Sequence, residues 1–142
     1  TITVSASKTY SYIFKSKSWT ATLDGNSADW TSGKDGNGYS NDGVQVTTGS
    51  TGANATSPID FTNVSKIVVK YCTNNNAGKG TVTLKVGGSD FGFQSITAPS
   101  SGGTTEKTFE ITPKTPLSGK VNISVSCTKN SIYIKGISIT AK

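Results

Sequence analysis

The sequence predicts an all-β fold: a two-sheet antiparallel β-sandwich, with a jelly roll favoured over an immunoglobulin-like arrangement. Three observations lead to this prediction. Apolar and polar residues alternate over short segments, turn-forming residues recur every 8–12 positions or so, and no segment has the 3.6-residue period of a helix. At 142 residues, the chain is expected to form one domain over residues 1–142.

The first part of the chain combines short strands with one long polar segment. Strands are expected at residues 1–5, 10–14, 19–23 and 44–47. Residues 23–44 show no alternation, and they contain several glycines and acids together with Trp30 and Tyr39. Loops of this length are uncommon in compact domains and are usually either functional or disordered, so this one is predicted to be a binding loop.

The rest of the chain alternates more regularly. Strands are expected at residues 59–61, 66–72, 81–87, 91–96, 107–111, 121–127 and 132–140. In the fourth of these, Phe91 and Phe93 are expected on one side. In the last, Ile134 and Ile137 have opposite parity, and Gly136 between them is the natural place for a β-bulge that restores the phase.

The composition narrows the classes of function. The chain has no His and no Arg, and its formal charge of +6 comes from lysine against eight acids. Without His, the commonest general base and the His-dependent catalytic triads are excluded, so no enzyme is expected. The lysines are scattered, which is typical of solvated strand faces, although an acidic ligand is an alternative. Nucleic acid is not expected as a partner, because Arg is absent.

The sequence favours neither glycosidase activity nor insertion into a membrane. The carboxylates of residues 23–44 include enough acids for a glycosidase pair, but such a pair needs rigid support that a glycine-rich loop does not supply. No apolar run approaches the ~18 residues of a membrane span, so no membrane insertion is expected. The first residues lack the basic and apolar regions of a signal peptide. A mature secreted protein or an excised module would look the same.

The long loop supplies the candidate ligand site. Sugar rings present flat C–H faces that stack on aromatic rings, and their hydroxyls pair with amides, carboxylates and lysine. The predicted glycan-binding residues are therefore Trp30, Tyr39, Lys34, Asp35, Asn37 and Asn41. The alternative is that Trp30 folds back over the end of the sandwich as a core residue.

The same loop contains a candidate structural calcium site. Calcium takes six to eight oxygen ligands, and glycines permit the sharp turns that such sites require. The predicted ligands are Asp24, Asp35, Asn37 and Asp42. The one-three spacing of Asp35 and Asn37 fits a calcium loop, but no Glu closes an EF-hand pattern. The alternative is turn chemistry, because Asp-Gly and Asn-Gly are common hairpin residues.

The two cysteines, Cys72 and Cys127, leave two alternatives open. An apparently extracellular chain with two cysteines suggests one disulfide. Strand parity argues against it, because Cys127 shares the inward face of its strand while Cys72 shares the outward face with Lys66 and Lys70. Two buried thiols are the other possibility.

The framework strands resemble those of small jelly-roll carbohydrate-binding modules, which are appended to extracellular polysaccharide-degrading enzymes and to surface or phage proteins of gut bacteria. The resembling segments are residues 10–14 (YSYIF), 19–23 (WTATL), 61–69 (FTNVSKIVV) and 131–137 (SIYIKGI). The resemblance implies a non-catalytic domain that holds a larger extracellular or cell-surface protein against a polysaccharide or glycan, often with a bound calcium. The alternative is a structural or adhesive domain of a virion, fibre or cell-surface assembly.

Overall fold

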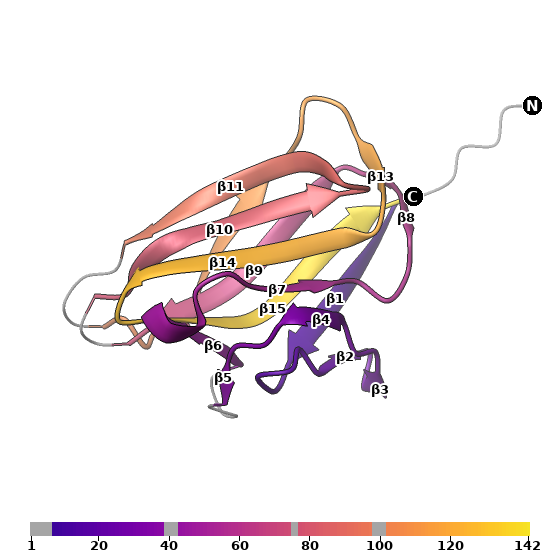
Figure 1. Cartoon of the computed structure of the whole chain (residues 1–142). Helices are drawn as coiled ribbons and strands as arrows, with labels where there is room; N and C mark the ends of the chain where they lie inside the picture. The colour runs from indigo at the N-terminus through magenta and orange to yellow at the C-terminus, as the bar shows by residue number, and fades with distance from the viewer. Residues whose placement is uncertain (1–6, 39–42, 75–76, 98–101) are drawn as a thin grey trace, which may run out of the picture.

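The chain folds into two antiparallel β-sheets packed face to face, which confirms the predicted all-β sandwich (Figure 1). The structure is a computed structural model, and it describes residues 7–38, 43–74, 77–97 and 102–142. The predicted strand at residues 1–5 lies outside the described residues. Among the described residues, no helix is long and apolar enough to cross a membrane.

The larger sheet, sheet A, is organised around its longest strand. In spatial order it contains β12 (Lys107–Ile111), β9 (Lys66–Thr73), β15 (Ser131–Ala141), β1 (Lys8–Phe14), β2 (Ala21–Leu23) and β3 (Asn26–Ser27). Two more strands extend it, β6 (Val44–Thr47) beside β15 and β5 (Asn37–Gly38) beside β6. The strand β15 therefore shares one edge between β6, along its first half, and β1, along its second half.

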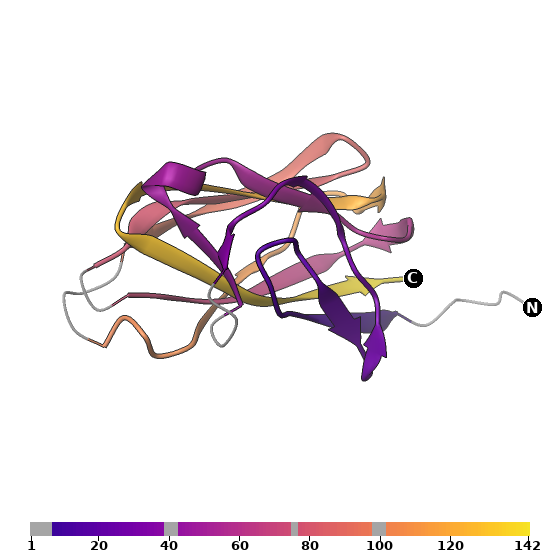
Figure 2. The same ribbon diagram turned by 60° about the horizontal axis from the view of Figure 1, so that its bottom comes forward.

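The second sheet, sheet B, covers the other side of the core. Its strands are β11 (Ser89–Thr97), β10 (Lys79–Val86), β14 (Val121–Lys129), β7 (Ala53–Thr56) and β4 (Thr31–Lys34), in this spatial order. A short ribbon pairs β13 (Leu117–Gly119) with β8 (Phe61–Val64), and the 3-10 helix η2 (Thr48–Ser50) follows β6. Figure 2 separates the two layers, with β1 and β15 in one and β10 and β11 in the other.

The alternation in the sequence becomes the inner face of each sheet. Along β14, Val121, Ile123, Val125 and Cys127 are buried, while the residues between them are half-buried or exposed. The sandwich core therefore needs few apolar residues per strand, because each outer face is left to hydroxyls and lysines. This explains how a chain with 32% apolar residues still forms a core.

The predicted bulge in the last strand is confirmed. The pairing of β15 with β9 shifts register between Ile134 and Gly136, and Lys135 is the extra residue. On both sides of the bulge the isoleucines are buried, so the shift returns Ile137 to the face that Ile134 occupies. A Cβ added at Gly136 would lie 2.7 Å from the Tyr12 carbonyl oxygen of β1, which is the physical reason for glycine there.

The segment predicted as one irregular loop contains short strands. β3, β4 and β5 all lie within residues 23–44. The expected strand at residues 19–23 is shorter than predicted: β2 begins at Ala21, because Trp19 has a φ of 60° and cannot continue an extended strand. Trp19 is nevertheless fully buried.

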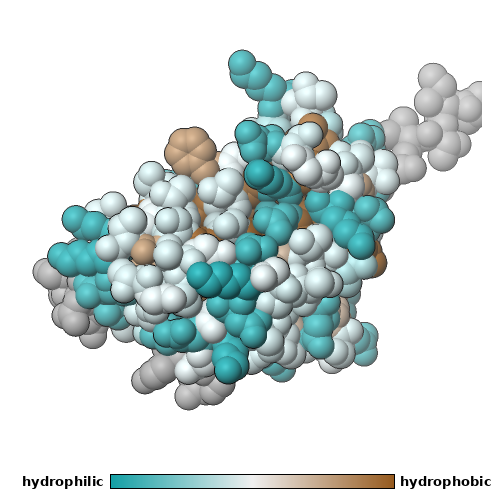
Figure 3. All heavy atoms as spheres, viewed as in Figure 1, coloured by the Kyte–Doolittle hydropathy of each residue, from teal (hydrophilic) through white to brown (hydrophobic). Residues whose placement is uncertain are grey.

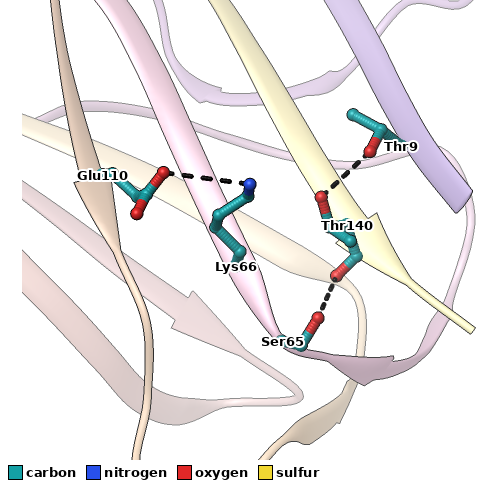
Figure 4. A network of polar contacts seen from close by, with 5 residues as sticks. All are labelled: Thr9, Ser65, Lys66, Glu110 and Thr140. Atoms are coloured by element: carbon teal, nitrogen blue, oxygen red, sulfur yellow. Dashed lines mark hydrogen bonds and ion pairs between the residues drawn. The ribbon is translucent and has the colours of Figure 1, made fainter. Parts of the chain in front are cut away.

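The outer face of sheet A is polar. Figure 4 shows part of it: the Thr9 and Thr140 hydroxyls are 3.0 Å apart, and Lys66 lies 3.8 Å from Glu110 across β9 and β12. Both charged side chains of this pair are about half exposed, so the pair contributes about 0–1 kcal/mol at most.

Candidate functional site

The predicted binding loop is tied to the preceding segment by backbone hydrogen bonds. The Trp30 amide donates to the Trp19 carbonyl at 3.2 Å, and the Gly36 amide donates to the Lys17 carbonyl at 2.9 Å. The Ala21 amide donates to the Asp29 carboxylate at 2.9 Å. Residues 29–36 are therefore an ordered part of the sandwich wall.

Trp30 is a core residue, and its predicted role in stacking on a sugar is wrong. Its side chain is 3% exposed, and its ring meets the rings of Tyr12 and Phe14 edge-on, with centroids 5.4 and 5.3 Å away. Phe14 makes the same kind of contact with Trp19 at 5.2 Å. Burial of this large ring is the main reason that it turns inward, and such edge-on pairs add about 0.5–1.5 kcal/mol each.

The other described members of the predicted site are exposed but divided between the sheets. Lys34 belongs to β4 of sheet B, and its ammonium donates to the Thr51 carbonyl at 2.7 Å. Asn37 belongs to β5 of sheet A, and its amide donates to the Thr47 hydroxyl at 3.2 Å. Between them, Asp35 accepts a hydrogen bond from Ser32. Two further predicted members, Tyr39 and Asn41, lie outside the described residues.

The described residues contain no cluster of acidic metal ligands. No group of three or more Cys, Asp or Glu side chains that could hold a metal ion occurs in residues 7–38, 43–74, 77–97 and 102–142. Asp24 occupies the turn between β2 and β3 with a φ of 52°, whereas Asp35 is bonded to Ser32 near β4. The fourth predicted ligand, Asp42, lies outside the described residues, so calcium binding stays a prediction.

Of the two alternatives for the cysteines, the structure contains the second: no disulfide joins them, and both are buried thiols. Cys127 lies in the core cluster on β14 of sheet B. Cys72 lies opposite Tyr133 on the outer side of β9, in sheet A, and is not part of that cluster. The parity of the two strands thus keeps the sulfurs on different sides of sheet A. Burial raises the pKa of the Cys127 thiol above its ordinary value of 9.0, which keeps it protonated at neutral pH.

The exposed aromatic ring of the described surface is Phe93, which the strand pattern placed on the same side as Phe91. The register of β10 and β11 shifts between Leu84 and Lys85, and Phe91 is the extra residue. This bulge turns Phe91 inward, where it is 7% exposed, and leaves Phe93 68% exposed on the outer face. The sequence signal that could have indicated this bulge is the glycine between two phenylalanines, Phe91-Gly92-Phe93.

A row of side chains crosses sheet B from Phe93. Directly paired residues of antiparallel strands share a face, and the ladder connects the row across all five strands. Its members, which we call the Phe93 face, are Phe93, Thr83, Ser124, Asn54 and Lys34. Figure 3 shows this side of the molecule as mostly polar, with apolar atoms projecting over β11. A hollow of about 390 Å³ lies beside the ring, between Thr83 and Asp90.

A larger depression lies on the outer face of sheet A. It has a volume of about 780 Å³ and sits where β6 and β1 part from β15. We call it the lysine groove, and its lining includes Ile13, Lys15, Lys70, Lys135, Gly136, Asp24 and Glu106. Sequence inspection did not find it, because these residues come from three strands and three connecting segments that are far apart in the sequence.

Comparison with known proteins identifies the fold. No family model matches the sequence, and no curated protein matches it. Among solved structures, the C-terminal CBM6 of LamC, a marine laminarinase from Zobellia galactanivorans, is 17% identical with a TM-score of 0.51, over 94% of this chain and 99% of that one. A carbohydrate-binding module CBM36, solved in complex with calcium and xylotriose, is 21% identical with a TM-score of 0.50, over 76% of this chain and 87% of that one.

A match to an enzyme covers only a small part of that enzyme. A glycoside hydrolase family 43 arabinoxylan arabinofuranohydrolase from Bacillus subtilis, in complex with cellotetraose, is 16% identical with a TM-score of 0.52 over 84% of this chain. The chain spans only 25% of the length of that protein. The modules that it matches over nearly their full length are carbohydrate-binding modules rather than catalytic domains. The chain therefore has the β-sandwich fold of the CBM6 and CBM36 carbohydrate-binding modules.

Proposed function

We propose that the chain is a non-catalytic carbohydrate-binding module that attaches a larger extracellular protein to a polysaccharide. The observation that carries the proposal is the Phe93 face. A phenyl ring that is 68% exposed gains nothing from the core, and it stands on a sheet face otherwise made of polar side chains.

The chemistry of this face suits a sugar chain. The Phe93 ring offers an apolar face for the C–H side of a pyranose. Beside it, the Thr83 and Ser124 hydroxyls make no side-chain hydrogen bond to a described residue, so both can pair with sugar hydroxyls. Adjacent strands are about 4.8 Å apart, so a row across five strands spans about 19 Å, enough for several sugar units.

The expected affinity is low. A shallow face with one stacking ring and exposed hydroxyls gains little beyond the contact of that ring, so binding is expected in the micromolar range or weaker. Modules of this kind act by holding a parent protein near its polysaccharide, and the fold likeness to carbohydrate-binding modules supports the same role here.

The test is retention of the purified domain in gels that contain neutral polysaccharides, such as xylan, mixed-linkage glucan and galactan. Phe93→Ala is expected to weaken retention about tenfold or more, because truncating an aromatic anchor removes most of the contact energy. Ile59→Ala is the matched control: Ile59 is 43% exposed, lies outside the Phe93 face and should leave retention unchanged.

Two outcomes would overturn the proposal. The first is equal retention of the wild type and Phe93→Ala on every polymer that binds. The second is an absence of retention together with an ordered assembly, seen by size-exclusion chromatography, that Phe93→Ala dissolves. The second result would instead support the structural or adhesive alternative.

A further inference from the structure

We propose that the lysine groove of sheet A is a second, separate binding site that takes an anionic sugar residue bearing a carboxylate or a sulfate group. It lies on the opposite sheet from the Phe93 face and is carried by different observations. It therefore goes beyond the proposed function, and either site can exist without the other.

The groove results from the way in which β15 pairs. One edge of β15 pairs with β6 up to Ile134 and with β1 from Gly136 onward, so the two partners part at Lys135. The same residue is the bulge in the pairing with β9. Because Gly136 has no side chain, only backbone lies between its cross-strand neighbours Ile13 and Lys70. Bulges often re-aim side chains beside functional sites, and this one brings Lys135 into the lining.

Three cations converge on this depression from three neighbouring strands. Lys70 lies on β9, Lys135 on β15 and Lys15 directly after β1, and these strands are adjacent in sheet A. The two acids of the lining lie toward the edges of the sheet, Glu106 just before β12 and Asp24 just after β2. The positive charge is thus central and the negative charge peripheral.

These lysines are available to a ligand. Within the described part of the chain the one ion pair joins Lys66 to Glu110 (Figure 4), and neither residue lines the groove. Other lysines of the fold donate to carbonyls, as Lys34 does to Thr51, but Lys15, Lys70 and Lys135 make no side-chain hydrogen bond to a described residue. A cluster of like charges that forms no ion pair with the acids at its edges favours the binding of an anion.

The remaining lining favours a sugar as the carrier of that anion. Ile13 is 57% exposed and gives the groove an apolar wall, while Ser11, Thr22 and Ser138 contribute hydroxyls. A volume of about 780 Å³ lies in the range of small-molecule sites, so it accommodates more than an inorganic ion. An apolar wall, hydroxyls and central cations together match the ring face, the hydroxyls and the acid group of an acidic saccharide.

The test uses pairs of polymers that share a sugar backbone, one member neutral and the other negatively charged. One pair is fully methyl-esterified and de-esterified homogalacturonan, which tests a carboxylate. The other is dextran and dextran sulfate, which tests a sulfate. Retention in polymer-containing gels is measured for the wild type, for Lys70→Gln/Lys135→Gln, and for Lys114→Gln/Lys120→Gln, which removes the same charge from exposed positions outside the groove.

The wild type is expected to bind the charged member of at least one pair more strongly than the neutral member. Lys70→Gln/Lys135→Gln should weaken that binding about tenfold, since each close charge contact in water contributes a small but additive amount. The preference should fade toward 1 M salt, where the screening length falls to about 3 Å. Lys114→Gln/Lys120→Gln should change binding less than twofold.

Equal losses in the two double variants would overturn the groove site, because they would show only the effect of net charge. No preference for either charged polymer would also overturn it. Neither result affects the Phe93 face, because retention on neutral polymers and its loss in Phe93→Ala are measured in the same gels. The two proposals can therefore fail separately.

Discussion

At the scale of single residues, Trp30 and Phe93 lie in the opposite environments from those that their sequence surroundings indicate. Trp30 stands among glycines and polar residues but is 3% exposed, whereas Phe93 stands in an alternating strand but is 68% exposed. Trp30 is drawn inward by the rings of Tyr12 and Phe14, which are distant in the sequence. Phe93 is turned outward by a bulge two residues before it.

The two rings should therefore differ in their effect on stability. Trp30→Ala is expected to lower the free energy of unfolding by about 3–5 kcal/mol, because it removes a large buried ring and leaves a cavity. Phe93→Ala should change it by about 0.5 kcal/mol or less, as is usual for exposed positions. Urea denaturation of both variants checks this, and a small loss for Trp30→Ala would contradict its place in the core.

At the scale of elements, the β-bulges decide which side chains reach each surface. The bulge in β11 exposes Phe93, and the bulge in β15 brings Lys135 into the groove while keeping Ile134 and Ile137 in the core. A one-residue slip in a strand reverses its inner and outer faces. A bulge shifts the register by one residue at a single point, so it keeps apolar residues in the core and changes which side chains reach the surface.

The bulge in β15 requires glycine at position 136. Gly136→Ala is expected to lower the free energy of unfolding by about 1–3 kcal/mol, because its Cβ would lie 2.7 Å from the Tyr12 carbonyl oxygen and the backbone of β1 would have to move. Gly49→Ala is the control, since its Cβ would lie 3.6 Å from its nearest neighbour atom, the Thr47 hydroxyl oxygen, which is an ordinary van der Waals contact. Similar thermal and urea stabilities for the two variants would show that β1 yields easily at this point.

At the scale of the whole molecule, buried titratable groups predict how stability depends on pH. Burial, with a smaller contribution from Tyr10, raises the pKa of Tyr12 above 10.0, and burial raises the pKa of Tyr71 and of Cys127. The folded chain therefore holds these protons more tightly than the unfolded chain. The resulting stability is complete below the ordinary pKa values of 9.0 and 10.0 and is lost as pH rises through the folded-state values.

The free energy of unfolding is thus expected to fall from about pH 9 toward pH 11, the range in which Cys and Tyr side chains ionise. Urea denaturation between pH 7 and pH 11 measures it. Because the lysines also lose charge in this range, the informative quantity is the difference between the wild type and Tyr12→Phe, which should lose less stability. Parallel curves for the two proteins would show that the Tyr12 hydroxyl contributes nothing.

The pattern of residues by itself determined the sandwich, most of its strands and the bulge at Gly136. These features depend on alternation and turn residues, which are local in the sequence. It did not decide between a disulfide and two thiols for the cysteines, although strand parity favoured the thiols that the structure contains. The extent of the loop at residues 23–44 was overestimated, because its short strands are held by partners outside it, as Asn37 is by Gln45.

The tertiary structure alone decided that Phe93 is exposed and which lysines come together. Phe93 reaches the surface through a register shift between two strands, and the three lysines of the groove come from strands more than 50 residues apart in the chain. Exposure and proximity depend on which strands pair and in which register, and pairing is a property of long-range packing. A local pattern specifies the faces of a strand, but the neighbours of each face are set only when the sheets have formed.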